Sequence, residues 1–217
     1  IGYEAMDAAN AGEASNVAIG YGAMGAVDET INSGAGVHSA DNNIAIGENA
    51  LTGGALGGGD VSDSTTRRLN YNVAIGGNAL NSTGTNDCQG QVAVGYNSLT
   101  ALTSGAKNTS VGHESGQALT TGLNNTILGY GAAKILTAGG NNTVLGYQAL
   151  DAADGTEEHN IAIGTGAMGA VDEGSHADAV ANGNIAIGSA ALNGGTFSSS
   201  DLDLLGNVAI GYTAMYS

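Results

Sequence analysis

Several residue types that build ordinary globular cores are scarce in this chain of 217 residues. It has no proline, no tryptophan and one phenylalanine, and aromatic residues make up 4% of it. Because large rings supply much of the buried area in conventional cores, their scarcity excludes a core built around them. The single Cys88 excludes an internal disulfide and a cysteine-based zinc site. No apolar run reaches the ~20 residues of a membrane-spanning helix, and no segment resembles a signal peptide.

Positive charge is also scarce. Four Lys and Arg residues stand against 20 Asp and Glu residues, which gives a formal net charge of −16. Arg67, Arg68, Lys107 and Lys134 are too few and too scattered to neutralise the phosphates of a nucleic acid. The same shortage disfavours an anionic membrane surface. We therefore expect no nucleic-acid partner and no direct membrane insertion.

A short glycine-centred repeat dominates what is present. A nine-residue core such as Asn16–Met24 (NVAIGYGAM) occurs ten times, and the opening Ile1–Met6 is an eleventh, incomplete copy. From that incomplete copy we expect the chain to be a piece of a longer protein. The fifth core residue is glycine in every copy, at Gly2, Gly20, Gly47, Gly76, Gly95, Gly112, Gly129, Gly146, Gly164, Gly188 and Gly211. The shortest spacing between these glycines is 17 residues and the longest is 29, so a 17-residue unit carries insertions.

Each repeat predicts one coil of a β-solenoid. The core begins with a short β-branched segment bounded by turn residues, which favours a strand over a helix. The glycine that follows permits a bend, and the remaining residues are few enough for a second strand or a tight corner. We therefore expect an all-β fold, a parallel β-roll or β-solenoid of about 10–11 coils stacked about 4.8 Å apart. Residues 1–217 form a single repeat domain in this interpretation, with insertions at 27–42, 52–71, 81–90, 169–183 and 193–206.

The strand has two apolar faces, and one thin coil can bury only one of them. The third core residue is usually Ala and shares a face with the Asn and the Gly, whereas the second and fourth are Val or Ile. We expect Ala and the ninth residue, Leu or Met, to fill the coil. The other face would leave an exposed apolar stripe, which soluble monomers rarely show. The stripe comprises Val17, Ile19, Ile44, Ile46, Val73, Ile75, Val92, Val94, Ile161, Ile163, Ile185, Ile187, Val208 and Ile210.

This stripe predicts that identical chains pack along it, and three is the natural number for a fibre. Two of the shortest repeats complicate the pattern, because Thr126 and Thr143 take the second position and Ile127 and Val144 take the third. In that stretch we expect the larger apolar side chain to change from the face of the second position to the face of the third.

The Asn16–Gly20 segment and its counterparts in the other copies resemble the head repeats of trimeric autotransporter adhesins, the YadA-like parallel β-roll. In its 17-residue form, as at Asn125–Asn141, the repeat is also similar to the shafts of phage tail fibres and virion fibres. The resemblance covers nearly the whole chain through motifs of low complexity. It implies a homotrimeric fibre on the outside of a virion or a bacterial cell, with a role in attachment. The adhesin repeats are shorter and more regular, and they lack the long acidic insertions of this chain.

No residue pattern predicts catalysis. Two G-x-G-x-x-G matches, Gly20–Gly25 and Gly164–Gly169, follow predicted strands, but no βαβ pattern of a dinucleotide fold follows either one. Ser115 lacks a G-x-S-x-G context and a positioned base. The histidines lie mostly in insertions, where we expect them to be solvated loop residues; they are His38, His113, His159 and His176. We expect neither an enzyme nor an organic cofactor.

The acidic residues and the tyrosines leave two binding possibilities open. Nearly all acids lie outside the repeat cores, and a solvated, self-repelling surface is the main interpretation. Calcium is the alternative, with Asp151, Asp154 and Glu157 as candidate ligands. Six tyrosines follow the core glycine, which predicts a stacked ladder, with glycan binding through exposed rings as the alternative. They are Tyr3, Tyr21, Tyr96, Tyr130, Tyr147 and Tyr212.

Together these features predict a structural and adhesive fibre segment. A phage or virus fibre shaft that attaches to a host surface is the first interpretation, and the head of a bacterial surface adhesin is the second. An ice- or glycan-binding solenoid is a further alternative, although Thr109, Thr126 and Thr143 give only three threonine rungs. Contacts with a host receptor or glycan are expected in the longest insertions, 27–42 and 52–71, because insertions escape the stacking constraint.

Overall fold

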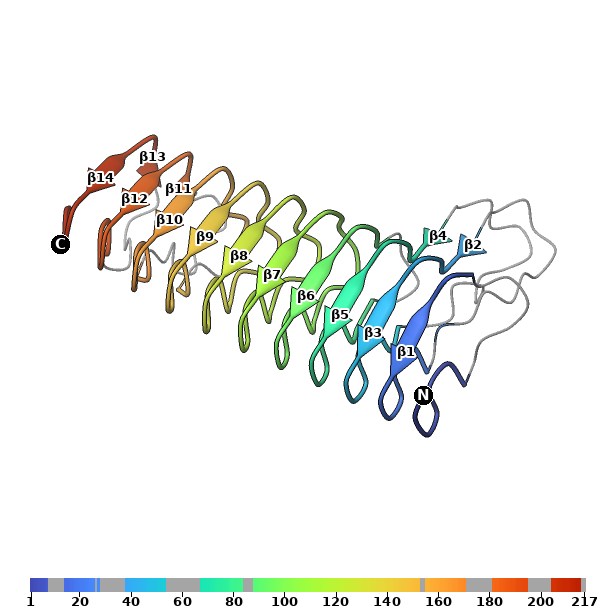
Figure 1. The fold of residues 1–217 in the computed structure, drawn as a ribbon. Coiled ribbons are helices and arrows are strands. Elements are labelled where there is room, and N and C mark those ends of the chain that lie inside the picture. The colour runs from blue at the N-terminus through green and yellow to red at the C-terminus, as the bar shows by residue number, and fades with distance from the viewer. Residues whose placement is uncertain are drawn as a thin grey trace.

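The computed structural model describes residues 1–7, 14–25, 27, 38–53, 67–83, 88–152, 155–170, 181–194 and 204–215. Within these ranges all regular structure is β, and ten strands of three residues lie side by side in one parallel sheet in chain order (Figure 1). These strands are β1 (Val17–Ile19), β3 (Ile44–Ile46), β5 (Val73–Ile75), β6 (Val92–Val94), β7 (Thr109–Val111), β8 (Thr126–Leu128), β9 (Thr143–Leu145), β10 (Ile161–Ile163), β12 (Ile185–Ile187) and β14 (Val208–Ile210).

Every repeat forms one coil of a β-solenoid, as predicted. Neighbouring strands pair at equivalent core positions, for example Val17 with Ile44 and Thr126 with Thr143. After each strand the chain forms a tight turn and returns behind the sheet to begin the next coil (Figure 1). Two further parallel pairs lie away from the main sheet: β2 (His38–Ser39) with β4 (Arg67–Arg68), and β11 (Ala181–Asn182) with β13 (Leu204–Leu205).

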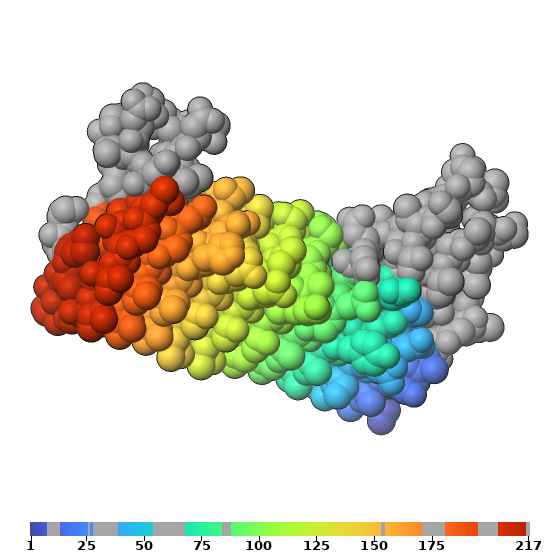
Figure 2. Space-filling model, turned by 90° about the horizontal axis from the view of Figure 1, so that it is seen from above, coloured from blue at the N-terminus to red at the C-terminus, as the bar shows by residue number. Residues whose placement is uncertain are grey.

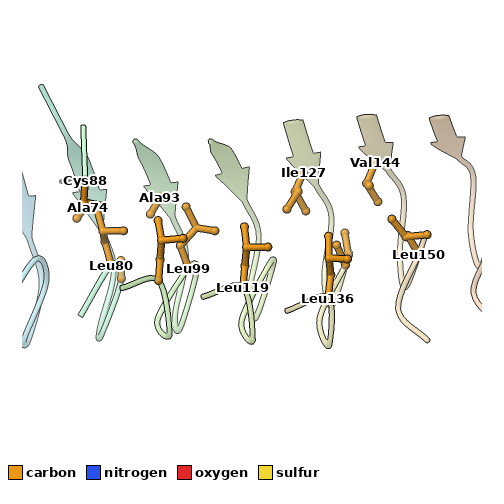
Figure 3. Close-up of a cluster of buried hydrophobic side chains, with 14 of the residues drawn as sticks. Ala74, Leu80, Cys88, Ala93, Leu99, Leu119, Ile127, Leu136, Val144 and Leu150 are labelled. Carbon is orange, nitrogen blue, oxygen red and sulfur yellow. The ribbon is translucent and has the colours of Figure 1, made fainter. Parts of the chain in front are cut away.

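The predicted division of the strand into an inner and an outer face is confirmed. The middle residue of each strand is buried and its two neighbours are not, throughout the sheet. Except in the first and last copies, the eighth and ninth core residues, such as Ala50 and Leu51, are buried opposite the strands. The side chains from successive coils therefore form one continuous, narrow core along the rod (Figure 3).

Near Thr126 and Thr143 the larger apolar side chain moves to the inner face, as expected, and the two faces keep their assignment. Ile127 and Val144 still point inward with no exposed area, and Leu128 and Leu145 point outward. The core accommodates Ile127 because Gly116 takes the ninth position in the coil before it, where most coils have Leu or Met. A Cβ atom at Gly116 would lie 2.9 Å from Leu99 Cδ2 and 3.1 Å from Ile127 Cδ1, so these side chains fill that space.

This packing predicts unequal costs for two neighbouring truncations. Ile127→Ala removes a fully buried side chain from a core with little room to collapse, so we expect a loss of about 3–4 kcal/mol in unfolding free energy. Leu128→Ala removes a side chain that is 44% exposed, and we expect about 1 kcal/mol or less. Urea unfolding of dilute protein, where chain association contributes least, compares the two variants. Equal costs would contradict the assignment of the faces.

A ladder of buried amide side chains ties the sheet to the return segments. In the central coils Asn125 Oδ1 accepts hydrogen bonds from the backbone N–H (3.0 Å) and Nδ2 (3.1 Å) of Asn142. Asn125 Nδ2 donates to Asn108 Oδ1 at 3.1 Å and to the carbonyl oxygen of Gly139 at 2.9 Å. Asn125 thus links its own coil to both neighbours, because its oxygen serves the strand of the next coil and its nitrogen reaches the previous amide and its own return segment. The ladder consists of Asn16, Asn43, Asn72, Gln91, Asn108, Asn125, Asn142, Asn160, Asn184 and Asn207.

The repeat glycines stack in a column at the end of the sheet. Gly47 and Gly164 have φ angles of +132° and +127°, a region that residues with a Cβ atom rarely adopt. A Cβ atom at Gly47 would also lie 2.6 Å from the carbonyl oxygen of Gly76 in the next coil. The glycine is therefore required twice, by the backbone conformation and by the spacing of the coils.

Candidate functional site: the outer face of the sheet

The outer face is formed by the second and fourth core residues, which are the first and last residues of every strand. None of the fourteen residues of the predicted stripe is buried, and their exposed fractions reach 43% at Val17 and 66% at Ile210. The twenty residues that these positions supply over ten strands include no charged side chain, although the chain carries a net charge of −16. We call these twenty positions the outer face.

Three consecutive strands in the middle of the rod depart from the aliphatic pattern. β7, β8 and β9 begin with Thr109, Thr126 and Thr143, and all three side chains are exposed. We call these three residues the threonine belt. The last residues of β8 and β9, Leu128 and Leu145, remain apolar and are 44% and 42% exposed. The face is thus aliphatic at both ends of the sheet and mixed in its centre.

A column of aromatic rings borders the sheet at the sixth core position. The ring of Tyr130 stacks on that of Tyr147 with centroids 5.5 Å apart and planes 12° apart, and Tyr3 stacks on Tyr21 at 5.8 Å. The predicted tyrosine ladder is confirmed for these pairs. Tyr96 lies at one end of the central stack.

His113 is exposed in a turn, as expected, but it also belongs to the column of aromatic rings. It takes the sixth position of its coil, and its ring centroid lies 5.2 Å from that of Tyr96 and 5.1 Å from that of Tyr130. The signal was present in the sequence, because His113 follows the core glycine as the tyrosines do. Since His113 and Tyr130 have ring neighbours on both sides, they present ring edges to solvent. A sugar that binds by stacking needs an open ring face, which these two rings do not offer.

An ion pair lies beside this stack. Lys134 Nζ is 2.8 Å from Glu114 Oε2, and His113 Nδ1 is 3.9 Å from the same oxygen. The hydrogen bond from Lys134 lowers the pKa of the Glu114 carboxyl and raises the pKa of the Lys134 ammonium. Because the pKa of Glu114 is lowered in the folded chain, its ionised form stabilises the fold above the usual pKa of a glutamate. This stabilisation is lost as the pH falls through the lowered pKa. The side chains of Lys134 and Glu114 are 42% and 19% exposed, so solvent still screens the pair and the effect on stability is small.

Replacing Lys134 isolates its effect on the pKa of Glu114. We expect Lys134→Met to raise the pKa of Glu114 towards its ordinary value, because the hydrogen-bond donor and the positive charge are lost together. NMR titration of the Glu114 side-chain carboxyl carbon measures it. Lys107→Met is the matched control, since Lys107 is exposed and lies outside this pair. An unchanged pKa of Glu114 in Lys134→Met would contradict the assignment.

Two of the three candidate calcium ligands, Asp151 and Glu157, lie among the described residues. Asp154 lies outside those residues. Glu157 is buried, with Oε1 accepting a hydrogen bond from the Gly155 N–H at 3.4 Å, and burial raises the pKa of Asp151. Within the described part of the chain no three His, Cys, Asp or Glu side chains lie close enough together to hold a metal ion.

The other motifs belong to the coil architecture. Gly20–Gly25 and Gly164–Gly169 lie in the turn that follows β1 or β10, and no helix follows either one within the described residues. Ser115 is buried, and its hydroxyl lies 2.7 Å from Ser110 Oγ and 3.2 Å from Ser98 Oγ. These hydroxyl contacts hold the eighth core position inside the solenoid.

The insertions predicted to contact a receptor, 27–42 and 52–71, lie mostly outside the described residues. Their returning ends are described, and there β2 pairs with β4 in the register His38 to Arg67. The insertions 81–90, 169–183 and 193–206 are likewise only partly described, and β11 pairs with β13 where the last two return. The described coils follow one another in chain order along the rod (Figure 2).

The chain matches no protein-family model, and the comparisons with curated proteins and with solved structures give no match. No helix among the described residues has the length and hydropathy to span a membrane.

Proposed function

We propose that this chain is a structural and adhesive fibre segment, a phage or virus fibre shaft in which three identical chains pack along the outer face and present their insertions to a host surface. The observation that carries the proposal is the uncharged outer face, which runs the length of a rod that is otherwise strongly acidic. Continuous exposed apolar surface of this kind marks an interaction site. The resemblance of the repeats to fibre shafts and adhesin heads supports the same role.

The geometry favours association between copies over a catalytic role. Like-charged rods repel each other along their acidic surfaces, and a strip without charge is where they can approach at the least electrostatic cost. All side chains of this strip except Leu128 and Leu145 are β-branched, and they are held in rows by the ladder of the sheet. Ordered rows of this kind pack against a second set of the same rows with little loss of side-chain entropy.

Charge placed on the outer face is expected to break the assembly. Leu128→Lys combined with Leu145→Lys puts two ammonium groups where chains would meet, and burying unpaired charges is costly. We expect this double variant to be monomeric by light scattering. The matched control is Leu123→Lys with Ile135→Lys, because these residues are 44% and 40% exposed but lie outside the sheet. The same mass for both double variants would contradict packing along the outer face.

The place of the fibre is tested by immunogold electron microscopy with an antibody raised against this chain. Label on fibres that project from virions supports the first role. A bacterial adhesin head is the second candidate, because its repeats share the strand and glycine pattern, and label on fibres of the bacterial envelope would favour it. Label confined to the cell interior would contradict both.

A further inference from the structure

A regular repeat creates an ambiguity that the outer face has to resolve. Each coil presents nearly the same pair of side chains, so two rods could pack equally well after sliding past each other by one coil. In seven of the ten strands the first residue is Val or Ile, which distinguishes no level from the next. The threonine belt is the exception, because it marks three adjacent levels of the rod.

The hydroxyl groups of the belt are available to a partner. The three residues pair in register in β7, β8 and β9, and within the described residues none of their hydroxyls forms a hydrogen bond to the chain. A second threonine column on the return side behaves differently. There Thr103 Oγ1 donates to the carbonyl oxygen of Thr120 at 3.2 Å, and Thr120 Oγ1 donates to that of Thr137 at 2.8 Å. The second column serves its own coils, whereas the belt faces outward.

We propose that the threonine belt fixes the axial register when a second copy of this chain packs in parallel on the outer face. The proposal rests on the proposed function, because it requires the copies to meet at this face. A second copy is the occupant that the charge distribution favours: its own uncharged strip is complementary to this one, and the acidic surfaces of both rods stay in solvent.

The physical basis is the cost of a mismatched hydroxyl. In register, each threonine meets its own counterpart, and the two hydroxyls can pair. A slip of one coil brings Thr109 to the level of Val92 and Thr143 to the level of Ile161, where no hydroxyl is available. An unpaired buried hydroxyl costs about 1 kcal/mol or more. Two mismatches therefore disfavour the slipped arrangement by roughly 30-fold. One buried polar residue sets the register of some coiled coils in the same way.

Register-specific disulfides test the proposal. One chain carries Ile163→Cys on β10 and a first affinity tag. It is paired with a chain that has a second tag and carries either Ile163→Cys, at the same level, or Ile187→Cys on β12, one level away. The two chains are refolded together and oxidised. A disulfide needs Cα atoms about 4.4–6.8 Å apart, so it forms only between residues at one level. We expect Ile163→Cys to crosslink with itself and about 30-fold less with Ile187→Cys. The native Cys88 is buried, so it stays in place.

The belt is then removed without touching the reporters. In Thr109→Val/Thr126→Val/Thr143→Val we expect an unchanged mass by light scattering and a roughly 30-fold rise in crosslinks between different levels, because the mismatch cost is gone. The matched control replaces the same three residues with Ser, which keeps the hydroxyls and should keep the register.

Each failure identifies its own cause. A monomeric wild-type chain would overturn the proposed function and the register proposal together. A wild-type oligomer that crosslinks equally between levels, or a valine variant that keeps the register, would overturn the register proposal alone. An oligomer without crosslinks at any level would show that the copies meet elsewhere, which overturns both the face and the belt.

Discussion

Gly164→Ala is expected to disrupt the stacking of the solenoid and to cost about 4 kcal/mol or more in unfolding free energy. Gly164 has a φ angle of +127°, and a Cβ atom there would lie 2.6 Å from both the carbonyl carbon and the carbonyl oxygen of Gly188. The atoms in the way are backbone atoms of the next coil, so no side chain can move aside. The two coils would have to separate, which breaks the hydrogen bonds between them.

Gly211→Ala is the matched control for this result. Gly211 has almost the same φ angle, +126°, but among the described residues no atom other than those of its chain neighbours lies within 4 Å of the position of its Cβ. Its substitution measures the conformational penalty alone, which we expect to be about 1–2 kcal/mol. Thermal unfolding followed by circular dichroism compares the two variants. Equal losses would show that backbone conformation alone, and not the approach of the coils, requires glycine.

Asn125→Asp is the second large effect. The substitution keeps the shape of the side chain, but an oxygen replaces Nδ2 and faces two acceptors, Asn108 Oδ1 and the carbonyl oxygen of Gly139. Asn125 is 1% exposed, so the carboxylate would be buried without a donor on that side. We expect a loss of about 4 kcal/mol at neutral pH, in the range measured for uncompensated buried charges.

The pH dependence of this loss has a definite sign. Burial raises the pKa of the introduced carboxyl above the value of about 3.9 in the unfolded chain. The protonated form can donate one hydrogen bond, so the loss of unfolding free energy is smallest below about pH 3.9. The loss grows as the pH rises through the raised pKa of the folded chain. Unfolding midpoints of the variant and the wild type at pH 4 and pH 7 measure the difference.

Two controls separate the charge from the change of side chain. Asn124→Asp adds the same charge at the adjacent exposed residue, and we expect a loss within about 0.5 kcal/mol. Asn125→Gln keeps the amide, and Gln91 already occupies a rung of the same ladder, where its Nε2 donates to the carbonyl oxygen of Gly105 at 2.8 Å. A loss for Asn124→Asp as large as that for Asn125→Asp would mean that net charge, and not the ladder, decides stability.

Much of the architecture was predictable because every coil of the solenoid is built from the same short residue pattern. The spacing of the glycines gives one coil per repeat, and alternation along the strand places residues such as Ala45 inside and Ile44 outside. The inner position of the amides was also predictable. Their hydrogen bonds were not, because each bond from one ladder residue to the next joins residues 17 or more positions apart, which meet only after the coils have stacked.

The parts that escaped prediction depend on contacts between coils or on unusual backbone conformations. Gly116 and Ile127 compensate each other in size from different coils, so neither repeat reveals the fit by itself. Leu99 and Leu150 are buried with φ angles of +49° and +51°. Leucine disfavours this conformation in isolation, and only the stacking of the turns imposes it.

The mass of the intact chain in solution, measured by light scattering across a range of concentrations, tests the central claim most directly. That claim is that the outer face, with Val17 and Ile19 at one end and Val208 and Ile210 at the other, is covered by identical chains. The account predicts a mass three times the 21.1 kDa of one chain. A stable monomer of 21.1 kDa would contradict it, because the apolar rows would then remain in solvent and the fibre would lose its physical basis.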